Sequence, residues 1–307
     1  MYEIKRAGRK NGPVLQQNRK EDMEYLTFPM LDATDLVKNL FSTRLGGVSE
    51  GIYGSLNLGF GRGDDDYNVL ENFKRVAEVL GTTPENMVRS SQTHTTNIKI
   101  VTDIDRGKGI VRPNEESDID GLITKEKGLV LVTSYADCVP LYFVDPVHEV
   151  IGLAHSGWRG TVGQIGAQMI KQMRDHFGTR PEDIVAAIGP SICRECYEVS
   201  EDVAEVFMNL EQEKKSAIRI LADSGIYIGL SEDSSADKIV TAGNVSGKYQ
   251  LDLWLANAAI LVDAGICPNK LSITDVCTCH NPEYLFSHRA SQGKRGGLCA
   301  FLMLKES

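Results

Sequence analysis

A stretch without a single polar position is the feature that most limits how this chain can fold. Leu129-Val130-Leu131-Val132 is apolar at every residue, whereas a strand with one face in water alternates apolar and polar side chains. The stretch therefore predicts a strand that is covered on both faces. Further strand candidates lie at residues 98–101, 141–145, 150–155, 184–188, 271–274 and 298–304.

Three segments carry apolar residues at the spacing of an amphipathic helix. They are residues 66–81, 161–177 and 249–264. The first begins at a capping carboxylate, Asp65 or Asp66, and ends at Gly81. Glycine also follows the other two segments, which supports the three predicted ends.

The predicted helices and strands alternate without a strict βαβ order. This favours an α/β fold of the mixed α+β sandwich type, one domain with mixed sheets flanked by helices, over a doubly wound sheet. Residues 26–307 are expected to form this domain. The mostly polar stretch 211–246 has apolar residues only around 218–221 and 226–230. We therefore expect it to be a surface excursion with minor elements.

The start of the chain is basic, with Arg9, Lys10, Arg19 and Lys20 among its charged residues. No apolar stretch follows these residues, as a secretory signal would require. We expect residues 1–25 to form a basic, solvated and partly disordered tail. No run of about 18 apolar residues occurs in the chain, so we expect no membrane span.

The acidic balance and the cysteine count narrow the class of protein further. Lys and Arg number 33 against 42 Asp and Glu, a formal charge of −9, which argues against a nucleic-acid polymer as partner. Seven cysteines cannot all pair within one chain. In a chain long enough to fold without disulfides, the odd count favours a reducing cytoplasm and leaves thiols for chemistry.

A turn sequence at residues 145–148, Asp-Pro-Val-His, predicts the register of a hairpin. With a two- or four-residue loop, Pro140 pairs with His155. Cys138 then lies diagonally from His155 on the same sheet face, about 7–8 Å away at Cα. A thiolate and an imidazole so placed can bind Zn²⁺ or form a Cys–His nucleophile pair. A buried cysteine near a structural histidine is the third interpretation.

His94 is the third candidate of this kind. It lies in a polar segment, residues 91–97, just before a predicted short strand. With Cys138 and His155 it would complete a set of one thiolate and two imidazoles, leaving the fourth position of a tetrahedral zinc ion open. An open position is typical of catalytic rather than structural zinc.

Short motifs in a fixed order resemble the YfiH/YlmD family. They run from Phe41 to Arg289 and include Gln92-Thr93-His94, Asp120-Gly121-Leu122-Ile123-Thr124, Ala136-Asp137-Cys138-Val139-Pro140, Ala154-His155-Ser156-Gly157-Trp158-Arg159-Gly160 and Ile188-Gly189-Pro190-Ser191-Ile192. The family has been described as multicopper polyphenol oxidoreductases, or laccase-like proteins. It is also described as purine nucleoside phosphorylases related to the human laccase-domain-containing protein.

The resemblance implies a single α/β domain and a zinc ion held by His94, Cys138 and His155. It also implies phosphorolysis of adenosine, inosine, guanosine and methylthioadenosine, with phosphate as co-substrate, and deamination of adenosine. Two alternatives stay open: a cysteine-dependent hydrolase or amidase acting on peptidoglycan precursors, and a copper-dependent polyphenol oxidase. Copper is disfavoured because a blue-copper centre plus a trinuclear cluster needs more imidazoles than six histidines supply.

Phosphorolysis requires a cationic pocket within an acidic protein. Arg44, just before the pair Gly46-Gly47, and Arg159, at the start of the helix predicted from residue 161, are the candidates for binding phosphate. Surface ion pairs are the alternative for both. Trp158 can stack on a base or pack in the core. Asp137 can act as a general acid or base or orient a ligand, so Asp137, Cys138 and Arg44 are the expected catalytic set.

Two features depart from the family pattern. The sequence Ser287-His288-Arg289-Ala290 replaces the usual Ser-Tyr-Arg-Arg, which leaves any substrate contact of the missing Tyr or Arg in doubt. Additional thiols occur in Cys193-Arg194-Glu195-Cys196 and Cys277-Thr278-Cys279-His280. Together they can form a structural zinc site; a disulfide between Cys193 and Cys196, or unligated thiols, are the alternatives. The sequence does not indicate an oligomeric state.

Overall fold

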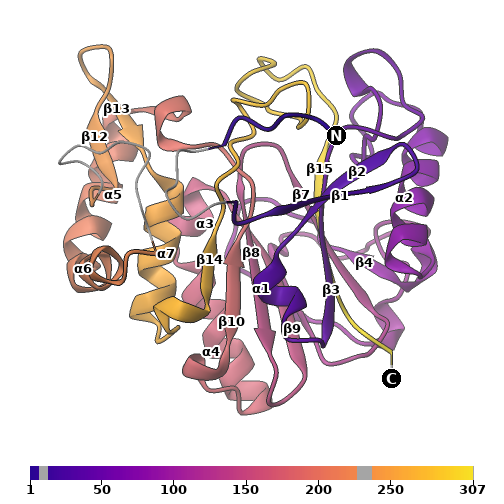
Figure 1. Cartoon of the computed structure of the whole chain (residues 1–307), viewed down its shortest axis with the longest axis horizontal. Coiled ribbons are helices and arrows are strands. Elements are labelled where there is room, and N and C mark those ends of the chain that lie inside the picture. Colours follow the sequence, from indigo (N-terminus) through magenta and orange to yellow (C-terminus); the bar gives the residue numbers. More distant parts are fainter. Residues whose placement is uncertain (7–12, 227–236, 307) are drawn as a thin grey trace.

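Two six-stranded sheets lie face to face at the centre of the molecule (Figure 1). The structure is a computed structural model that describes residues 1–6, 13–226 and 237–306. The first sheet has the order β1-β2-β3-β15-β7-β4, the second β14-β10-β8-β9-β6-β5, and a small third sheet β11-β13-β12. Both large sheets contain parallel and antiparallel pairs. The mixed α/β fold predicted from the sequence is confirmed.

The strands of the two large sheets are three to seven residues long. The first contains β1 (Gln16–Lys20), β2 (Met23–Thr27), β3 (Val37–Ser42), β15 (Leu298–Leu304), β7 (Val130–Tyr135) and β4 (Met87–Arg89). The second contains β14 (Leu271–Ile273), β10 (Val185–Ile188), β8 (Val139–Asp145), β9 (Val150–Ser156), β6 (Gly121–Thr124) and β5 (Ile98–Ile100). The third contains β11 (Glu198–Ser200), β13 (Lys248–Leu251) and β12 (Val240–Ala242). All seven predicted strands are present, with ends shifted by three residues at most.

The α-helices of the described residues are α1 (Pro29–Asp32), α2 (Asp66–Leu80), α3 (Trp158–Val162), α4 (Ile165–Phe177), α5 (Glu201–Glu213), α6 (Lys215–Ser224) and α7 (Leu253–Asp263). Among the described parts of the chain, none of these helices is long and apolar enough to cross a membrane. Helix α2 begins and ends as predicted. The Asp65 carboxylate accepts the N–H of Tyr67, and Gly81 ends the helix with a left-handed backbone, φ 67°.

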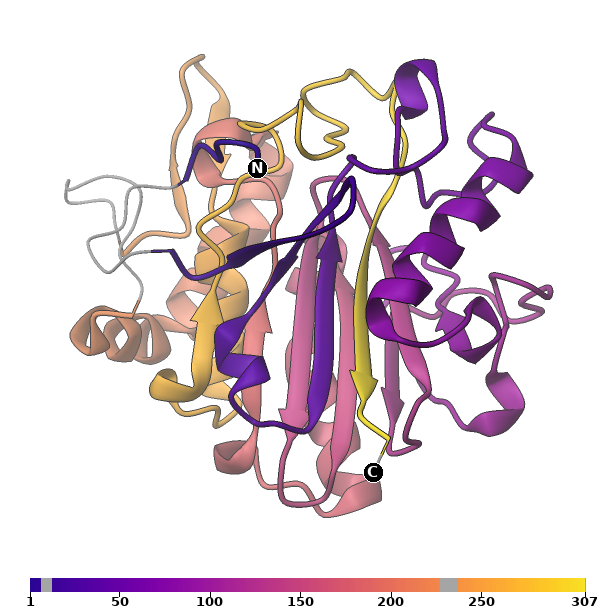
Figure 2. The same cartoon turned by 45° about the vertical axis from the view of Figure 1, so that its right-hand side comes forward.

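Helices cover the outer faces of both sheets, so apolar layers lie on each side of every central strand (Figure 2). Helix α2 packs on the first sheet through Val69, Phe73 and Val76. Helices α4 and α7 cover the second sheet. A third apolar cluster fills the space between the sheets. This layering explains why β8 and β9 are buried at every residue and why the run that includes Val130 lacks polar positions.

Two of the predicted helices have different bounds. The segment 161–177 is broken into α3 and α4 at Gly163 and Gln164. Gln164 has a left-handed backbone, φ 56°, and a Cβ at Gly163 would lie only 2.5 Å from Thr96. The segment 249–264 begins as β13, and α7 starts only after Asp252, whose carboxylate accepts the N–H of Leu255 at 2.9 Å.

The prediction that residues 211–246 form a surface excursion is wrong for the first part of this stretch. Residues 215–224 form α6, which follows α5 and packs against α7. Its buried side chains Ala217, Ile218 and Leu221 belong to the core that covers the second sheet. A single apolar stripe on ten residues is enough for a helix when a large apolar partner is available. Residues 227–230 of the second predicted apolar group lie outside the described residues.

The N-terminal segment also differs from a solvated tail. Residues 16–20 form β1, which pairs with β2, and β2 runs across the boundary expected at residue 25. Tyr2 stacks on Tyr284 with ring centres 4.7 Å apart, and Arg6 pairs with buried Asp275 at 2.8 Å. These contacts hold the segment against the body of the protein. The basic residues Arg9 and Lys10 lie outside the described residues.

The packing of α2 on the first sheet makes a stability prediction. The Phe73 ring is fully buried, with ring centres of Phe60 and Phe301 at 5.6 and 6.3 Å. We expect Phe73→Ala to lower the free energy of unfolding by about 3–5 kcal/mol, measured by urea denaturation. Tyr67→Ala, on the same helix but 68% exposed, is the control and should change it by less than about 0.5 kcal/mol. Equal effects of the two substitutions contradict this packing.

Candidate active site

Two connections cross from the first sheet to the second at the same end of the molecule. Strands β4 and β7 are parallel neighbours in the first sheet, so the loops that follow them leave from one edge. The first loop carries His94 to β5, and the second carries Cys138 to β8. Strand β9 runs antiparallel to β8, so His155, near its end, lies beside the start of β8. The topology thus brings the three predicted metal ligands together.

The β8–β9 hairpin has the register predicted from its turn sequence. Its ladder runs from the pair Asp145–Val150 through Pro140–His155 to Val139–Ser156. Residues 146–149 form a four-residue connection, and Glu149 takes the left-handed conformation, φ 52°. The prediction that the side chains of Cys138 and His155 lie close together is confirmed.

His94, Cys138 and His155 form a compact group of metal-type ligands. One side-chain atom from each lies within 4.8 Å of the others, and Sγ of Cys138 is 3.9 Å from Nε2 of His94. Gly157 allows this approach, since a Cβ there would lie 2.8 Å from His94 and 3.2 Å from Sγ of Cys138. His155 is buried and His94 is exposed. Two imidazoles and one thiolate with an open side are a donor set that fits a catalytic metal ion.

Asp120 orients His155 and was not assigned a role from the sequence. Its Oδ1 lies 2.8 Å from Nδ1 of His155, which leaves Nε2 of that ring for a metal. The same buried carboxylate accepts backbone N–H groups of Thr93, His94 and Thr95. Asp120 therefore fixes both histidines of the group. The only sequence signal was its place in one of the motifs of the family.

The electrostatics of the group favour a thiolate beside an imidazolium. Burial opposes ionisation of Cys138, but the charges and hydrogen bonds of His155 and His94 lower the pKa of its thiol to about 6. Burial lowers the pKa of His155, yet Cys138 and Asp120 outweigh it and raise that pKa to about 9. Burial also raises the pKa of Asp120, and hydrogen bonds from His155 and Thr95 bring it down to about 2. The thiolate form of Cys138 is the one that binds metals, and His155 binds a metal through Nε2 once that nitrogen has released its proton.

The orienting role of Asp120 can be tested by a conservative substitution. We expect Asp120→Asn to weaken metal binding by about 10–100-fold, because the ring of His155 loses its anionic partner. The measurement is zinc affinity by competition with a chromophoric chelator. Asp118→Asn is the matched control, since Asp118 accepts from Thr93 but does not contact His155. Equal zinc affinities of the wild type, Asp120→Asn and Asp118→Asn would contradict the orienting role of Asp120.

The ligand group opens into a cavity of about 530 Å³. Its lining is strongly cationic, and it also contains polar and aromatic side chains that can contact a substrate. The arginines of the lining are Arg62, Arg89, Arg289 and Arg295, and its other residues include Gln92, Asn114, Ser134, Asp137, Tyr197 and His288. The cavity therefore combines metal-type ligands with a local positive charge in an acidic protein.

Arg295 carries an unsatisfied donor in this cavity. Its Nη1 donates to the carbonyl oxygen of Gly296 at 2.9 Å, but its buried Nε has no partner within the described chain. Burial, together with the charge of Arg62, lowers the pKa of the guanidinium to about 10. Arg89 lies nearby in the lining and donates to Ser134 Oγ at 2.9 Å. Buried cations with unused donors are stabilised by an anion.

The cations expected to bind phosphate lie elsewhere. Arg44, Arg159 and Trp158 are not in the lining of this cavity. The half-buried guanidinium of Arg44 donates to the carbonyl oxygens of Gly54 and Pro282, each at 2.8 Å. Exposed Arg159 lies over the ring of Trp158, 4.2 Å from its centre. Arg44 thus links two loops, and Arg159 and Trp158 pair with each other.

Asp137 lies next to Cys138 in the lining and has a positive φ of 92°, a conformation that costs energy for a residue with a side chain. Its carboxylate accepts the hydroxyl of Thr278 at 2.6 Å and the backbone N–H of Arg289 at 2.7 Å. Both oxygens are therefore engaged by neighbouring loops. Of the two positions that depart from the family pattern, His288 lines the cavity and Ala290 does not.

The sequence did not predict the arginines of the cavity, because these residues lie far apart along the chain. Arg62 follows a glycine in a loop, Arg89 ends β4, and Arg295 precedes two glycines before β15. Each lies in or beside a segment that reaches the same end of the two sheets. A glycine next to the arginine is the only local signal at Arg62 and Arg295, and Arg159 carries the same signal without reaching the cavity.

A mixed α/β sandwich with a thiolate, two imidazoles and several guanidinium groups around one cavity defines a candidate metal-dependent enzyme. Residues 38–305 match the family model described as multi-copper polyphenol oxidoreductase laccase. The chain belongs to this family of enzymes, the YfiH/YlmD family that its motifs resemble.

Named relatives and a solved structure agree with this assignment. The chain is 38% identical over 268 residues to purine nucleoside phosphorylase YlmD of Bacillus subtilis, covering 87% of this chain and 88% of the relative. It is 30% identical over 267 residues to adenosine deaminase RL5 of an unknown prokaryotic organism, covering 84% and 93%. The crystal structure of Bacillus licheniformis hypothetical protein YfiH superposes with a TM-score of 0.79 at 33% identity, covering 97% of this chain and 98% of the other.

Proposed function

We propose that this protein is a zinc-dependent purine nucleoside phosphorylase. The observation that carries the proposal is one cavity lined both by His94, Cys138 and His155 and by a cluster of arginines, among them Arg295 with its unpaired Nε. Guanidinium groups are suited to binding phosphate oxygens. The name of the Bacillus subtilis relative, purine nucleoside phosphorylase YlmD, supports the same activity.

The proposed reaction transfers the ribosyl group to phosphate. An oxygen of inorganic phosphate forms a bond to C1′ while the bond between C1′ and N9 of the purine breaks. The electron pair of that bond stays on the base, which takes up a proton, and ribose 1-phosphate is the second product. Arg62, Arg89 and Arg295 hold the phosphate and balance its charge. Asp137 is a positioning residue, since its carboxylate fixes Thr278 and the Arg289 backbone.

His94, Cys138 and His155 are the proposed zinc ligands, and Asp120 orients His155. When bound, zinc supplies Lewis-acid polarisation of a substrate atom. Adenosine, inosine, guanosine and methylthioadenosine are the proposed nucleosides, and deamination of adenosine is a proposed second activity, supported by the name of the relative RL5. Tyr197 in the lining offers an aromatic face for the purine.

Zinc is preferred over the copper of the family description. The described residues place two histidines in this ligand group, enough for a single ion but not for a cluster of several copper ions. All seven cysteines are free thiols, which fits a reducing cytoplasm as the proposed location.

Metal removal tests the proposed function. Protein dialysed against a strong chelator is expected to lose release of hypoxanthine from inosine, and added Zn²⁺ is expected to restore it. Mg²⁺ is the control and should not restore activity, because thiolate and imidazole ligands favour zinc. The assay follows the free base by chromatography. Full activity in protein shown to be metal-free contradicts the proposal.

A second candidate function is a cysteine-dependent amidase, favoured by one specific geometry. Cys138, His155 and Asp120 are arranged as nucleophile, base and orienting carboxylate. This candidate predicts a thioester on Cys138 during turnover of an amide substrate such as a peptidoglycan precursor. Mass spectrometry of the quenched protein would detect the adduct. Metal-independent amide hydrolysis with an adduct, and no base release from inosine, would replace the phosphorylase assignment.

A further inference from the structure

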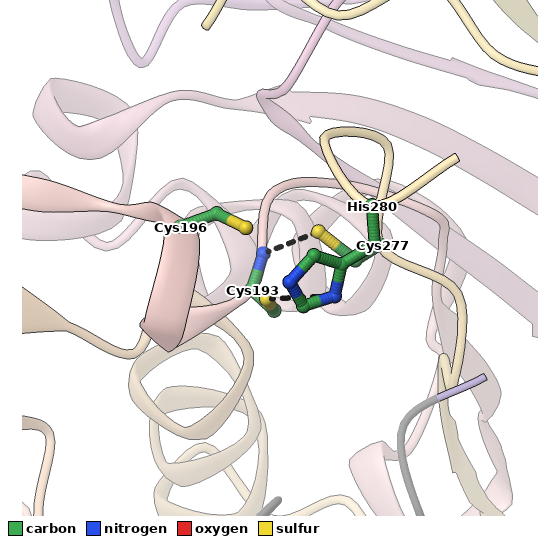
Figure 3. Close-up of side chains that lie close together, drawn as sticks. All are labelled: Cys193, Cys196, Cys277 and His280. Carbon is green, nitrogen blue, oxygen red and sulfur yellow. Dashed lines mark hydrogen bonds between the residues drawn. The ribbon is translucent and has the colours of Figure 1, made fainter. Parts of the chain in front are cut away.

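A second group of metal-type ligands lies outside the cavity. Cys193, Cys196, Cys277 and His280 each offer an atom within 4.8 Å of the others, and Figure 3 shows their side chains gathered from two separate segments. Strands β10 and β14 are parallel neighbours, so the loops that follow them leave the same edge of the second sheet. One loop carries Cys193 and Cys196, and the other carries Cys277 and His280.

Backbone hydrogen bonds join the two segments independently of the four side chains. Ser191 forms a parallel bridge with Cys277, and the N–H of Thr278 donates to the carbonyl oxygen of Ser191 at 3.1 Å. Within the first segment, the N–H of Cys196 donates to the carbonyl oxygen of Cys193 at 3.1 Å. The fold therefore joins the two backbone segments that carry the four ligands without any ion.

We propose that Cys193, Cys196, Cys277 and His280 form a structural zinc site. Three thiolates and one imidazole are a known structural set, and two residues between Cys193 and Cys196 is a ligand spacing. Cys277 and His280 are also separated by two residues. Four protein ligands leave no open position, which distinguishes this site from the catalytic group.

The separation between Cys193 and His280 fits a tetrahedral ion. Zinc bonds of about 2.0–2.3 Å put ligand atoms about 3.5–3.8 Å apart, and Sγ of Cys193 lies 3.9 Å from Nδ1 of His280. The N–H of Cys193 donates to Sγ of Cys277 at 3.3 Å, a hydrogen bond that stabilises a thiolate. The sequence grouped Cys279 with the other thiols, whereas the structure places His280 in the four-ligand group.

The proposed zinc site lies next to residues that form hydrogen bonds with Asp137. Ile192, next to Cys193, donates its N–H to the carbonyl oxygen of Asp137 at 3.0 Å. Thr278, next to Cys277, donates its hydroxyl to the Asp137 carboxylate at 2.6 Å. An ion that ties these two segments together would therefore stabilise the wall of the active-site cavity.

The test counts zinc in the full chain after the catalytic group has been disabled. In His94→Ala/Cys138→Ser, purified under reducing conditions, native mass spectrometry and elemental analysis are expected to find one zinc per chain. Adding Cys277→Ser is expected to remove that zinc, and adding Cys267→Ser instead should retain it, because Cys267 lies in neither ligand group. Cobalt substitution should give charge-transfer absorption from thiolates that the Cys277→Ser protein lacks.

A milder variant keeps the test decisive if Cys277→Ser does not fold. His280 is exposed, so His280→Ala should fold and lower zinc affinity by at least about tenfold. A folded His94→Ala/Cys138→Ser protein without zinc overturns the proposal, as does zinc retained at full affinity after His280→Ala. A mass lower by two hydrogens, located by peptide mapping to Cys193 and Cys196, would assign a disulfide instead.

Discussion

Cys138→Ser is expected to lower kcat/KM for phosphorolysis of inosine by at least about 10³-fold, the scale of losing a central catalytic group. The serine hydroxyl stays protonated near neutral pH, whereas the two imidazoles next to Cys138 favour its thiolate. The variant therefore loses the anionic ligand of the proposed zinc ion. Hypoxanthine release and zinc content, measured on the same sample, check both consequences.

The matched control for this prediction is Cys267→Ser. Cys267 is a half-buried thiol that belongs to neither ligand group, so its loss should leave kcat/KM within about twofold of wild type. Circular dichroism confirms that both variants are folded. A folded Cys138→Ser protein with wild-type kcat/KM would contradict the assignment of Cys138 as a ligand of the catalytic zinc.

Arg295→Gln is expected to raise KM for phosphate by about 10–100-fold, the cost of one charge-assisted hydrogen-bond partner. The substitution removes the cation whose buried Nε is unpaired in the cavity. Deamination of adenosine needs no phosphate, so its rate should change by less than about threefold. Steady-state kinetics with varied phosphate, together with a deamination assay on the same protein, separate the two effects.

Arg159→Gln is the control that compares the two sets of cations. Arg159 is exposed, lies over Trp158 and does not line the cavity. We expect its KM for phosphate to match that of the wild type. If Arg159→Gln raises KM for phosphate more than Arg295→Gln does, phosphate binds at Arg159, as the sequence indicated. That result would contradict a phosphate site in the cavity.

Local sequence determined those parts of the site that depend on a turn and a register. The Asp-Pro-Val-His turn fixes the β8–β9 hairpin, and period-two geometry then places Cys138 and His155 together. The cap at Asp65 and the left-handed Gly81 likewise define α2. Each of these interactions spans few residues, so the amino-acid types alone specify it.

Features that depend on long-range packing could not be predicted from the sequence. Arg62, Arg89 and Arg295 meet only because loops after distant strands reach one end of the two sheets. Helix α6 forms because α7 offers it an apolar partner, and β1 forms because β2 pairs with it. No pattern within these segments indicates their partners.

The measurement that tests the central claim most directly is identification of the sugar product formed from inosine by the zinc-loaded wild-type protein. The account predicts that hypoxanthine is released only when phosphate is present, with one ribose 1-phosphate formed for each base. Release of hypoxanthine at the same rate without phosphate, with free ribose as the sugar product, would contradict it.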